Sequence, residues 1–243
     1  TKGVRDPSII QSQDGTKFWL LATDLKIHGN GNWDAAVRTV PDGLVEVSPP
    51  TAGNTWAPEA IWDPQQETYV VFWASSLYAV NDTAHTGSLY QRILKSTTID
   101  FKTFTAAQIY IDYGWTVIDT TMVHDTSTGT YYRFNKDILS PGGDTPDSKF
   151  VTQEKSNSVT GAWTGVSVGI GKGVVTRGEG PTVFKSNTVA NKWHMLIDEN
   201  GGRGYVPLET TNISAGIWTA STNYVLPGRP RHGSIIPIRS TQH

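Results

Sequence analysis

The stretch Arg177-Gly178-Glu179-Gly180-Pro181-Thr182-Val183-Phe184 places one carboxylate between two glycines and a proline, ahead of an apolar run. The run predicts a buried strand, with Glu179 at its opening. The glycines let backbone or ligand come close to the carboxylate, and the proline stiffens the exit from the turn. A charge at the mouth of a buried strand contributes little to solubility, so its position points to a functional site.

The same plan recurs four more times along the chain. The other copies are Arg5-Asp6-Pro7-Ser8-Ile9-Ile10, Trp56-Ala57-Pro58-Glu59-Ala60-Ile61, Val117-Ile118-Asp119-Thr120-Thr121-Met122-Val123 and Arg231-His232-Gly233-Ser234-Ile235-Ile236. The polar residues that open the five strands are Asp6, Glu59, Asp119, Glu179 and His232, and successive ones are 53 or 60 residues apart. A period of this length, with several short strands per unit, is typical of a β-propeller.

Further strands follow each opening at hairpin distance, and no helical pattern of useful length is present. Second strands are expected at residues 17–22, 69–74, 131–134 and 192–197, and outer strands at 88–93 and 149–154. The sequence therefore predicts an all-β, five-bladed β-propeller that forms a single catalytic domain over residues 1–243. Residues 37–50 leave the first blade room for one outer strand, and the fifth blade has only its inner strand. We expect an N-terminal segment beyond this chain, or a second chain, to complete the fifth blade.

The composition excludes several classes of function. The net charge of −2 and the 17% charged residues give no basic field for nucleic acid, and no apolar run is long enough to span a membrane. Cysteine is absent, which excludes disulfides and thiolate chemistry. Nine tryptophans and nine tyrosines offer aromatic faces that can stack on sugar rings. The sequons Asn81-Asp82-Thr83 and Asn212-Ile213-Ser214 are compatible with secretion.

The five openings would converge at one mouth of the central channel, because the inner strands of a propeller surround its axis. Several carboxylates in a partly dry pocket cannot all stay ionised, so some of their pKa values are raised. An acid beside a base at neutral pH is the usual apparatus for glycoside hydrolysis.

The motifs resemble glycoside hydrolase family 43. The resemblance rests on the Asp-Pro of the first blade, Trp56-Ala57-Pro58-Glu59, Ile118-Asp119-Thr120, Glu179-Gly180-Pro181 and Arg231-His232-Gly233, in that order along almost the whole chain. It implies a five-bladed propeller and an inverting mechanism on arabinose- or xylose-containing oligosaccharides and polysaccharides of plants. No cofactor is implied for the reaction itself.

The resemblance also implies roles for individual residues. Asp6 matches the general base, Glu179 the general acid, and Asp119 the third carboxylate, which orients the acid and tunes its pKa. His232 matches a histidine that in some members helps to hold a calcium ion near the channel centre. For substrate binding we select residues near the predicted mouth: Asp24, Trp56, Glu59, Trp115 and Arg231.

Each role has a structural alternative. Asp6 before Pro7 is also a common turn initiator, Glu179 could pair with Arg177, and His232 could be a core histidine. The favoured function is a secreted α-L-arabinofuranosidase acting on arabinan or arabinoxylan. The alternatives are a β-xylosidase with the same carboxylates, an endo-arabinanase, and a carbohydrate-binding propeller without catalysis.

Overall fold

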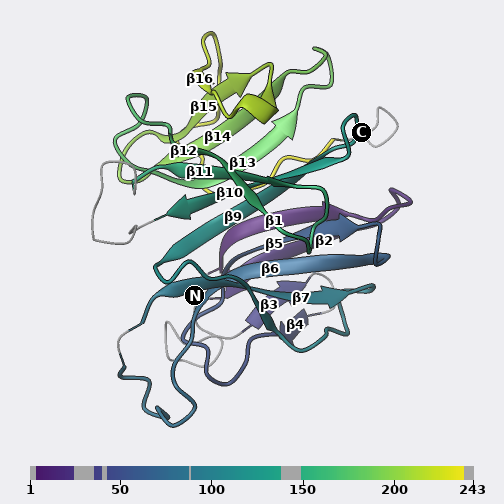
Figure 1. Cartoon of the computed structure of the whole chain (residues 1–243), viewed down its shortest axis with the longest axis vertical. Coiled ribbons are helices and arrows are strands. Elements are labelled where there is room, and N and C mark those ends of the chain that lie inside the picture. Colours follow the sequence, from purple (N-terminus) through teal and green to yellow (C-terminus); the bar gives the residue numbers. More distant parts are fainter. Residues whose placement is uncertain (1–3, 25–35, 40–42, 88, 138–148, 238–243) are drawn as a thin grey trace.

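The computed structural model describes residues 4–24, 36–39, 43–87, 89–137 and 149–237, and it arranges them as four four-stranded antiparallel sheets (Figure 1). Each sheet is built from four strands that are consecutive in sequence. The first has β1 (Val4–Gln11), β2 (Phe18–Asp24), β3 (Ala36–Thr39) and β4 (Gly43–Glu46); the second has β5 (Trp56–Asp63), β6 (Thr68–Ser76), β7 (Gln91–Thr98) and β8 (Gln108–Ile111). The third has β9 (Val117–Asp125), β10 (Thr130–Asp137), β11 (Val151–Ser156) and β12 (Thr164–Ile170); the fourth has β13 (Gly178–Lys185), β14 (Trp193–Glu199), β15 (Gly204–Thr210) and β16 (Thr219–Ala220).

The expected all-β, bladed architecture is thereby confirmed for the described residues. Their only helical element is the short 3₁₀ turn η1 (Ile213–Ala215), and among them no helix is long and apolar enough to cross a membrane. The first sheet has two outer strands, β3 and β4, so the prediction of one outer strand was wrong. The sequence signal was weak there because both strands are only four residues long.

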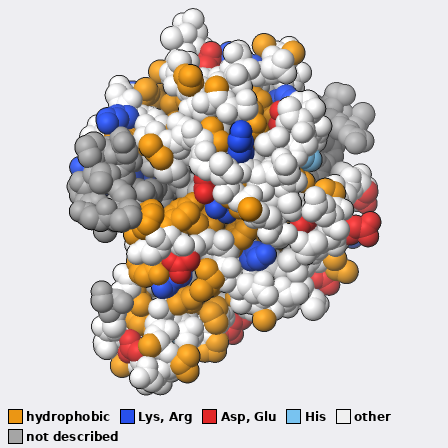
Figure 2. All heavy atoms as spheres, in the orientation of Figure 1, with side chains coloured by type: hydrophobic (Ala, Val, Ile, Leu, Met, Phe, Trp, Pro, Cys, Tyr) orange, Lys and Arg blue, Asp and Glu red, His pale blue; other side chains and the backbone are white. Residues whose placement is uncertain are grey.

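Hydrophobic cores fill the three gaps between consecutive sheets. Strand β6 shows why, because its side chains alternate between two faces. Tyr69, Val71 and Trp73 pack toward the first sheet, whereas Val70 and Phe72 pack toward the third. A third cluster joins the third and fourth sheets around Phe134 and Ile197, among others. Figure 2 shows hydrophobic side chains gathered over the lower half of the visible face, with isolated charges between them.

The first strands of the four sheets follow one another in space, with β1 against β5, β5 against β9 and β9 against β13. The C-terminal segment connects the ends of this series. Gly233 exchanges two hydrogen bonds with the Tyr205 hydroxyl of the fourth sheet, and the Ser234 hydroxyl accepts a hydrogen bond from the Ile9 amide of the first sheet. Residues 231–237 form no strand, so the expected inner strand of a fifth blade is absent from the described residues.

Each first strand contains a β-bulge at its opening. The pairing register shifts next to one residue of positive φ in every sheet: Asp6 (51°), Ala57 (45°), Asp119 (52°) and Gly180 (49°). These four positions are the structurally equivalent ones, and His232 also has a positive φ of 33°. The predicted equivalence was therefore wrong in two copies, because Glu179 precedes its bulge residue by one position and Glu59 follows its own by two. A bulge at this point re-aims the neighbouring side chains, which positions the site.

The equivalent bulge residues Ala57 and Gly180 give a matched test of backbone strain. In Ala57→Gly, relief of the left-handed strain of about 1–2 kcal/mol outweighs the roughly 0.5–1 kcal/mol entropic cost of glycine, so we expect a gain of up to about 1 kcal/mol. In Gly180→Ala, the new Cβ would lie 2.8 Å from the His232 ring at φ 49°, and we expect a loss of about 1–3 kcal/mol. Urea unfolding measures both, and shifts of equal sign would contradict the assignment.

Candidate active site

The central cavity lies where the four bulges meet, and it has a volume of about 20 Å³. Its lining comes from the first strands of all four sheets, from β15 and from the C-terminal segment: Asp6, Pro7, Ser8, Ala57, Pro58, Glu59, Asp119, Thr120, Gly180, Pro181, Tyr205, His232 and Gly233. A cavity of this size holds about one water molecule. The fold therefore brings four of the five predicted opening residues, Asp6, Glu59, Asp119 and His232, to the lining of one cavity. Glu179 is not part of the lining but contacts His232.

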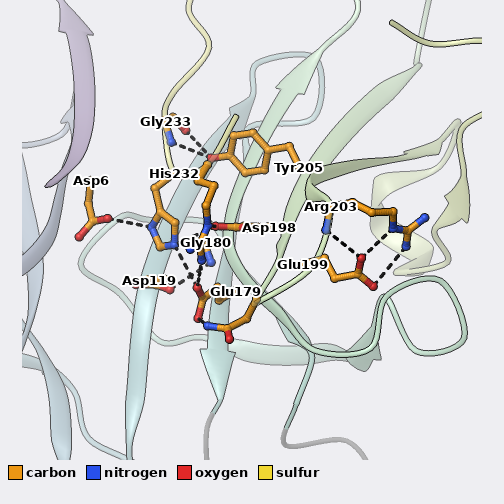
Figure 3. Close-up of polar contacts among 12 residues, drawn as sticks. Asp6, Asp119, Glu179, Gly180, Asp198, Glu199, Arg203, Tyr205, His232 and Gly233 are labelled. Atoms are coloured by element: carbon orange, nitrogen blue, oxygen red, sulfur yellow. Dashed lines mark hydrogen bonds and ion pairs between the residues drawn. The ribbon is translucent and has the colours of Figure 1, made fainter. Parts of the chain in front are cut away.

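His232 lies between two of the predicted catalytic carboxylates (Figure 3). Its Nδ1 is 3.1 Å from Asp6 Oδ1, and its Nε2 is 3.6 Å from Glu179 Oε1 and 3.4 Å from Asp198 Oδ2. Burial alone would lower the pKa of His232, but the hydrogen bonds to Asp6 and Glu179 and the surrounding negative charge raise it to about 11. The imidazole is therefore a cation that links the carboxylates.

Arg231 is the second cation of the site, and it also contacts two carboxylates. Its Nε donates to Asp198 Oδ2 and its Nη2 donates to Glu179 Oε1, both at 2.7 Å. Asn200 donates to the other oxygen of Glu179 at 2.6 Å. Burial raises the pKa of Glu179, but the hydrogen bonds from His232 and Asn200 and the two positive charges lower it more, so the net shift is downward. In this arrangement Glu179 is an ionised carboxylate, and its predicted partner Arg177 is not among its contacts.

Asp119 is buried directly behind the bulge of the fourth sheet. Its Oδ2 accepts a hydrogen bond from the Gly180 amide at 3.0 Å, which ties the third sheet to the residue beside Glu179. Burial raises the pKa of Asp119 to about 6; the charge on His232 opposes the shift and that on Asp6 adds to it. The hydrogen bond fixes Asp119 beside the backbone that carries Glu179.

Glu59 faces the same cavity from the second sheet. It accepts a hydrogen bond from the Thr121 hydroxyl at 2.8 Å. Burial, reinforced by the nearby negative charge of Asp119, raises the pKa of Glu59 to about 8, although the Thr121 bond opposes this shift. Glu59 is therefore protonated at neutral pH, which limits the repulsion among the grouped carboxylates.

The other residues selected from the sequence lie elsewhere. Trp56 packs against the core between the second and third sheets, and it does not line the central cavity. Trp115 lies 5.4 Å from Tyr113 between ring centroids, and both line a separate cavity of about 390 Å³. Asp24 ends β2 and pairs with Val4, but its side chain lies outside the described atoms. Neither tryptophan is thus placed as a sugar platform at the centre.

Three residues of the site were missed by the sequence reasoning: Asp198, Asn200 and Tyr205. Asp198 is completely buried at the end of β14, opposite Glu179 in the sheet register. The available signal was an aspartate directly after the apolar run of the second strand. Asn200 lies in the next turn, which Arg203 and Glu199 close with a 2.7 Å ion pair.

Glu179, Asp198 and His232 could in principle hold a metal ion, because one ligand atom of each lies within 4.8 Å of the others. One oxygen of Asp198, Oδ1, is buried without a hydrogen-bond partner. Arg231 already contacts both carboxylates, at 2.7 Å from Glu179 Oε1 and 2.7 Å from Asp198 Oδ2, so these two groups are compensated without an ion, and we derive no step through calcium.

Comparisons with known proteins identify the family of the chain. A family model described as a probable glycosyl hydrolase domain, related to glycoside hydrolase family 43, matches residues 1–243. An α-L-arabinofuranosidase of Bifidobacterium longum subsp. longum is 33% identical over an alignment of 204 residues that covers 70% of this chain. The match spans only 18% of that relative's length.

Solved structures share the fold at low sequence identity. A thermostable family-43 glycoside hydrolase superposes with a TM-score of 0.62 at 16% identity, covering 96% of this chain and 79% of that one. The catalytic domain of a Coprinopsis cinerea GH62 α-L-arabinofuranosidase superposes with a TM-score of 0.59 at 15% identity. The match covers 98% of this chain and 74% of that domain. An exo-β-1,3-galactanase of Phanerochaete chrysosporium superposes with a TM-score of 0.60 at 16% identity. The match covers 90% of this chain and 49% of that one.

The fold is that of solved glycoside hydrolases of families 43 and 62. The chain belongs to the family of probable glycosyl hydrolase domains related to family 43.

Replacing Glu59 with glutamine tests the charge balance of the site. The pKa of Glu59 is raised from 4.5 to about 8 in the folded protein, so the folded state keeps a proton that the unfolded chain releases. The stabilisation by protonated Glu59 is full below pH 4.5 and is lost as the pH rises toward about 8. Compared with Glu59→Gln, the free energy of unfolding of the wild type should fall by up to about 1.4 kcal/mol per pH unit across this window. Urea unfolding at several pH values measures the difference, and parallel curves would contradict it.

Proposed function

We propose that this chain is an inverting glycoside hydrolase, and that its activity is that of an α-L-arabinofuranosidase on arabinan or arabinoxylan side chains. The observation that carries the proposal is the convergence of three carboxylates from three sheets: Asp6 and Asp119 line one small cavity, and Glu179 lies beside it, next to His232. The Bifidobacterium relative, named an α-L-arabinofuranosidase, supports the choice of sugar. A polymeric substrate of this kind also favours an extracellular location.

The position of His232 supports the inverting route. Retaining enzymes hold their two carboxyl groups about 5–5.5 Å apart, whereas inverting enzymes leave about 6.5–9.5 Å for a water molecule. Here a whole imidazole ring lies between the carboxylates, with its Nδ1 3.1 Å from Asp6 and its Nε2 3.6 Å from Glu179. An imidazole ring between the two carboxylates favours the wider separation of the inverting class.

In the proposed reaction, Asp6 takes a proton from a water molecule that attacks the anomeric carbon. Glu179 donates a proton to the departing glycosidic oxygen, and Asp119 holds the Gly180 amide beside it. Because Glu179 is ionised in the free site, substrate binding has to weaken its contacts with Arg231 and His232 before it can act as an acid. A five-bladed ring remains part of this proposal, with the Gly233–Ser234 link marking the place of the fifth blade.

Substitution of the two carboxylates tests their separate roles. We expect Asp6→Asn to lower kcat/KM by about 10²–10⁴-fold on nitrophenyl α-L-arabinofuranoside and on an arabino-oligosaccharide alike. Glu179→Gln should lower kcat/KM far less on the nitrophenyl substrate than on the oligosaccharide, because nitrophenolate leaves without protonation. Glu46→Gln, a change of an exposed carboxylate, is the matched control.

The same assay with nitrophenyl β-D-xyloside compares the β-xylosidase alternative directly. Faster wild-type hydrolysis of the xyloside would overturn the choice of arabinose. Equal losses for Glu179→Gln on both leaving groups would overturn its role as the acid. Proton NMR of the first product formed reports whether the anomeric configuration is inverted.

Dialysis against a chelator tests whether a metal takes part. Because Arg231 and His232 already compensate the carboxylates, we expect kcat/KM to be unchanged after EDTA treatment and after the addition of calcium. A loss of activity that calcium restores would show that the site rearranges to hold the ion.

A further inference from the structure

A second cavity, of about 910 Å³, lies between the first and second sheets at the end remote from the catalytic carboxylates. It is lined by the β1–β2 turn and by the loop that follows β7. The β1–β2 turn projects at the right edge of Figure 1, beside the β5–β6 turn. Gln11 ends β1 five residues after Asp6, which corresponds to about 15–17 Å along the strand. The cavity, called the aromatic groove below, is therefore separate from the active site.

Aromatic rings form the wall of the groove. The Trp19 and Trp62 rings meet the Tyr69 ring edge-on, with centroids 5.5 and 4.9 Å away and interplanar angles of 62° and 64°. Phe101 stacks behind Trp19 at 4.5 Å. Both indoles are only partly buried, and Phe18 beside them is 42% exposed. The rings are thus held in fixed orientations while part of their surface remains open.

Polar side chains surround the aromatic wall. The β1–β2 turn provides Gln13, Asp14 and Lys17, and the loop after β7 provides Asp100 and Lys102. Both turns are ordered by their aspartates: Asp14 accepts hydrogen bonds from Ser12 and Thr16, and Asp100 accepts from the amides of Lys102 and Thr103. Two acidic and two basic residues leave the rim without net charge.

We propose that the aromatic groove is an accessory binding site for a neutral oligosaccharide segment of the polymeric substrate. Sugar rings present apolar C–H faces that stack on indole, and their hydroxyls need both donors and acceptors at the edge. The groove combines fixed tryptophans with a rim that offers amide, carboxylate and ammonium groups. An uncharged rim does not select an anionic or cationic ligand, which favours a neutral one.

The size of the groove fits the same ligand. Small-molecule sites range over about 300–1,000 Å³, so 910 Å³ accommodates several sugar units. A polymer held here at the far end of the molecule would keep the enzyme close to its substrate, raising the effective concentration of side chains at the active site. The nature of the polymer, arabinan or arabinoxylan, rests on the proposed function.

The test uses the hydrolytically impaired Glu179→Gln chain, so that binding is measured without turnover. Isothermal titration calorimetry follows its binding of soluble linear arabinan, soluble arabinoxylan and, as an unrelated neutral polymer, an α-glucan. Trp62→Ala and Phe18→Ala are introduced separately, with Ile217→Ala, which removes a 70% exposed side chain outside the groove, as the control. Thermal unfolding verifies that each variant is folded. If Trp62→Ala does not fold, Phe18→Ala alone tests the groove.

We expect each groove variant to raise the Kd for arabinan or arabinoxylan about tenfold, the effect of removing one aromatic ring from the binding surface. In the otherwise wild-type chain, the groove variants should leave hydrolysis of the nitrophenyl arabinofuranoside unchanged and slow that of the polymer. Unchanged polymer affinity, or an equal weakening of binding in Ile217→Ala, would overturn the accessory site. If wild type hydrolyses nothing but the groove variants still bind the polymer more weakly, the proposed catalysis fails while the accessory site stands.

Discussion

Charge balance in a nearly dry cavity is the constraint on which the site depends. Asp6, Glu59, Asp119 and His232 line this cavity, and Glu179, Asp198 and Arg231 lie directly beside them, so five carboxylates and two cations are grouped here. Full ionisation would leave uncompensated negative charge in a place with room for about one water molecule, which is costly. The protein avoids this in two ways, because Glu59 and Asp119 have raised pKa values and because Arg231 contacts two carboxylates and His232 three.

The two cations also explain why an irregular C-terminal segment keeps a defined course. Residues 231–237 have no strand to hold them, yet Arg231 and His232 engage the carboxylates while Gly233 and Ser234 bond the fourth and first sheets. Ion pairs and hydrogen bonds, rather than the backbone pairing of a regular strand, thus link the fourth sheet to the first. Gly180 takes part because a Cβ there would meet the His232 ring. The bulge geometry and the position of the imidazole are therefore coupled.

Much of this arrangement could be predicted from sequence, because alternating apolar runs and the single polar residue at each opening are local signals. They located the first two strands of every sheet and brought Asp6, Asp119 and Glu179 together. The structural equivalence of the strand openings could not be predicted from the sequence, because it depends on which residue has the positive φ. An alanine such as Ala57 gives no sequence signal for a positive φ. Asp198 was missed because a buried aspartate at a strand end looks like an ordinary turn residue until its partner Arg231 is placed.

The same charge balance sets the conditions for catalysis. Glu179 is held ionised by Arg231, His232 and Asn200. In the proposed reaction, sugar hydroxyls would replace some of these hydrogen bonds. Each charged donor that moves away from Glu179 lets its pKa rise toward the protonated form that an acid catalyst needs. Buried Asp198 keeps its own hold on Arg231 through the Nε atom, so the cation can leave Glu179 without leaving the site. In the proposed mechanism, substrate binding and protonation of Glu179 are in this way one coupled event.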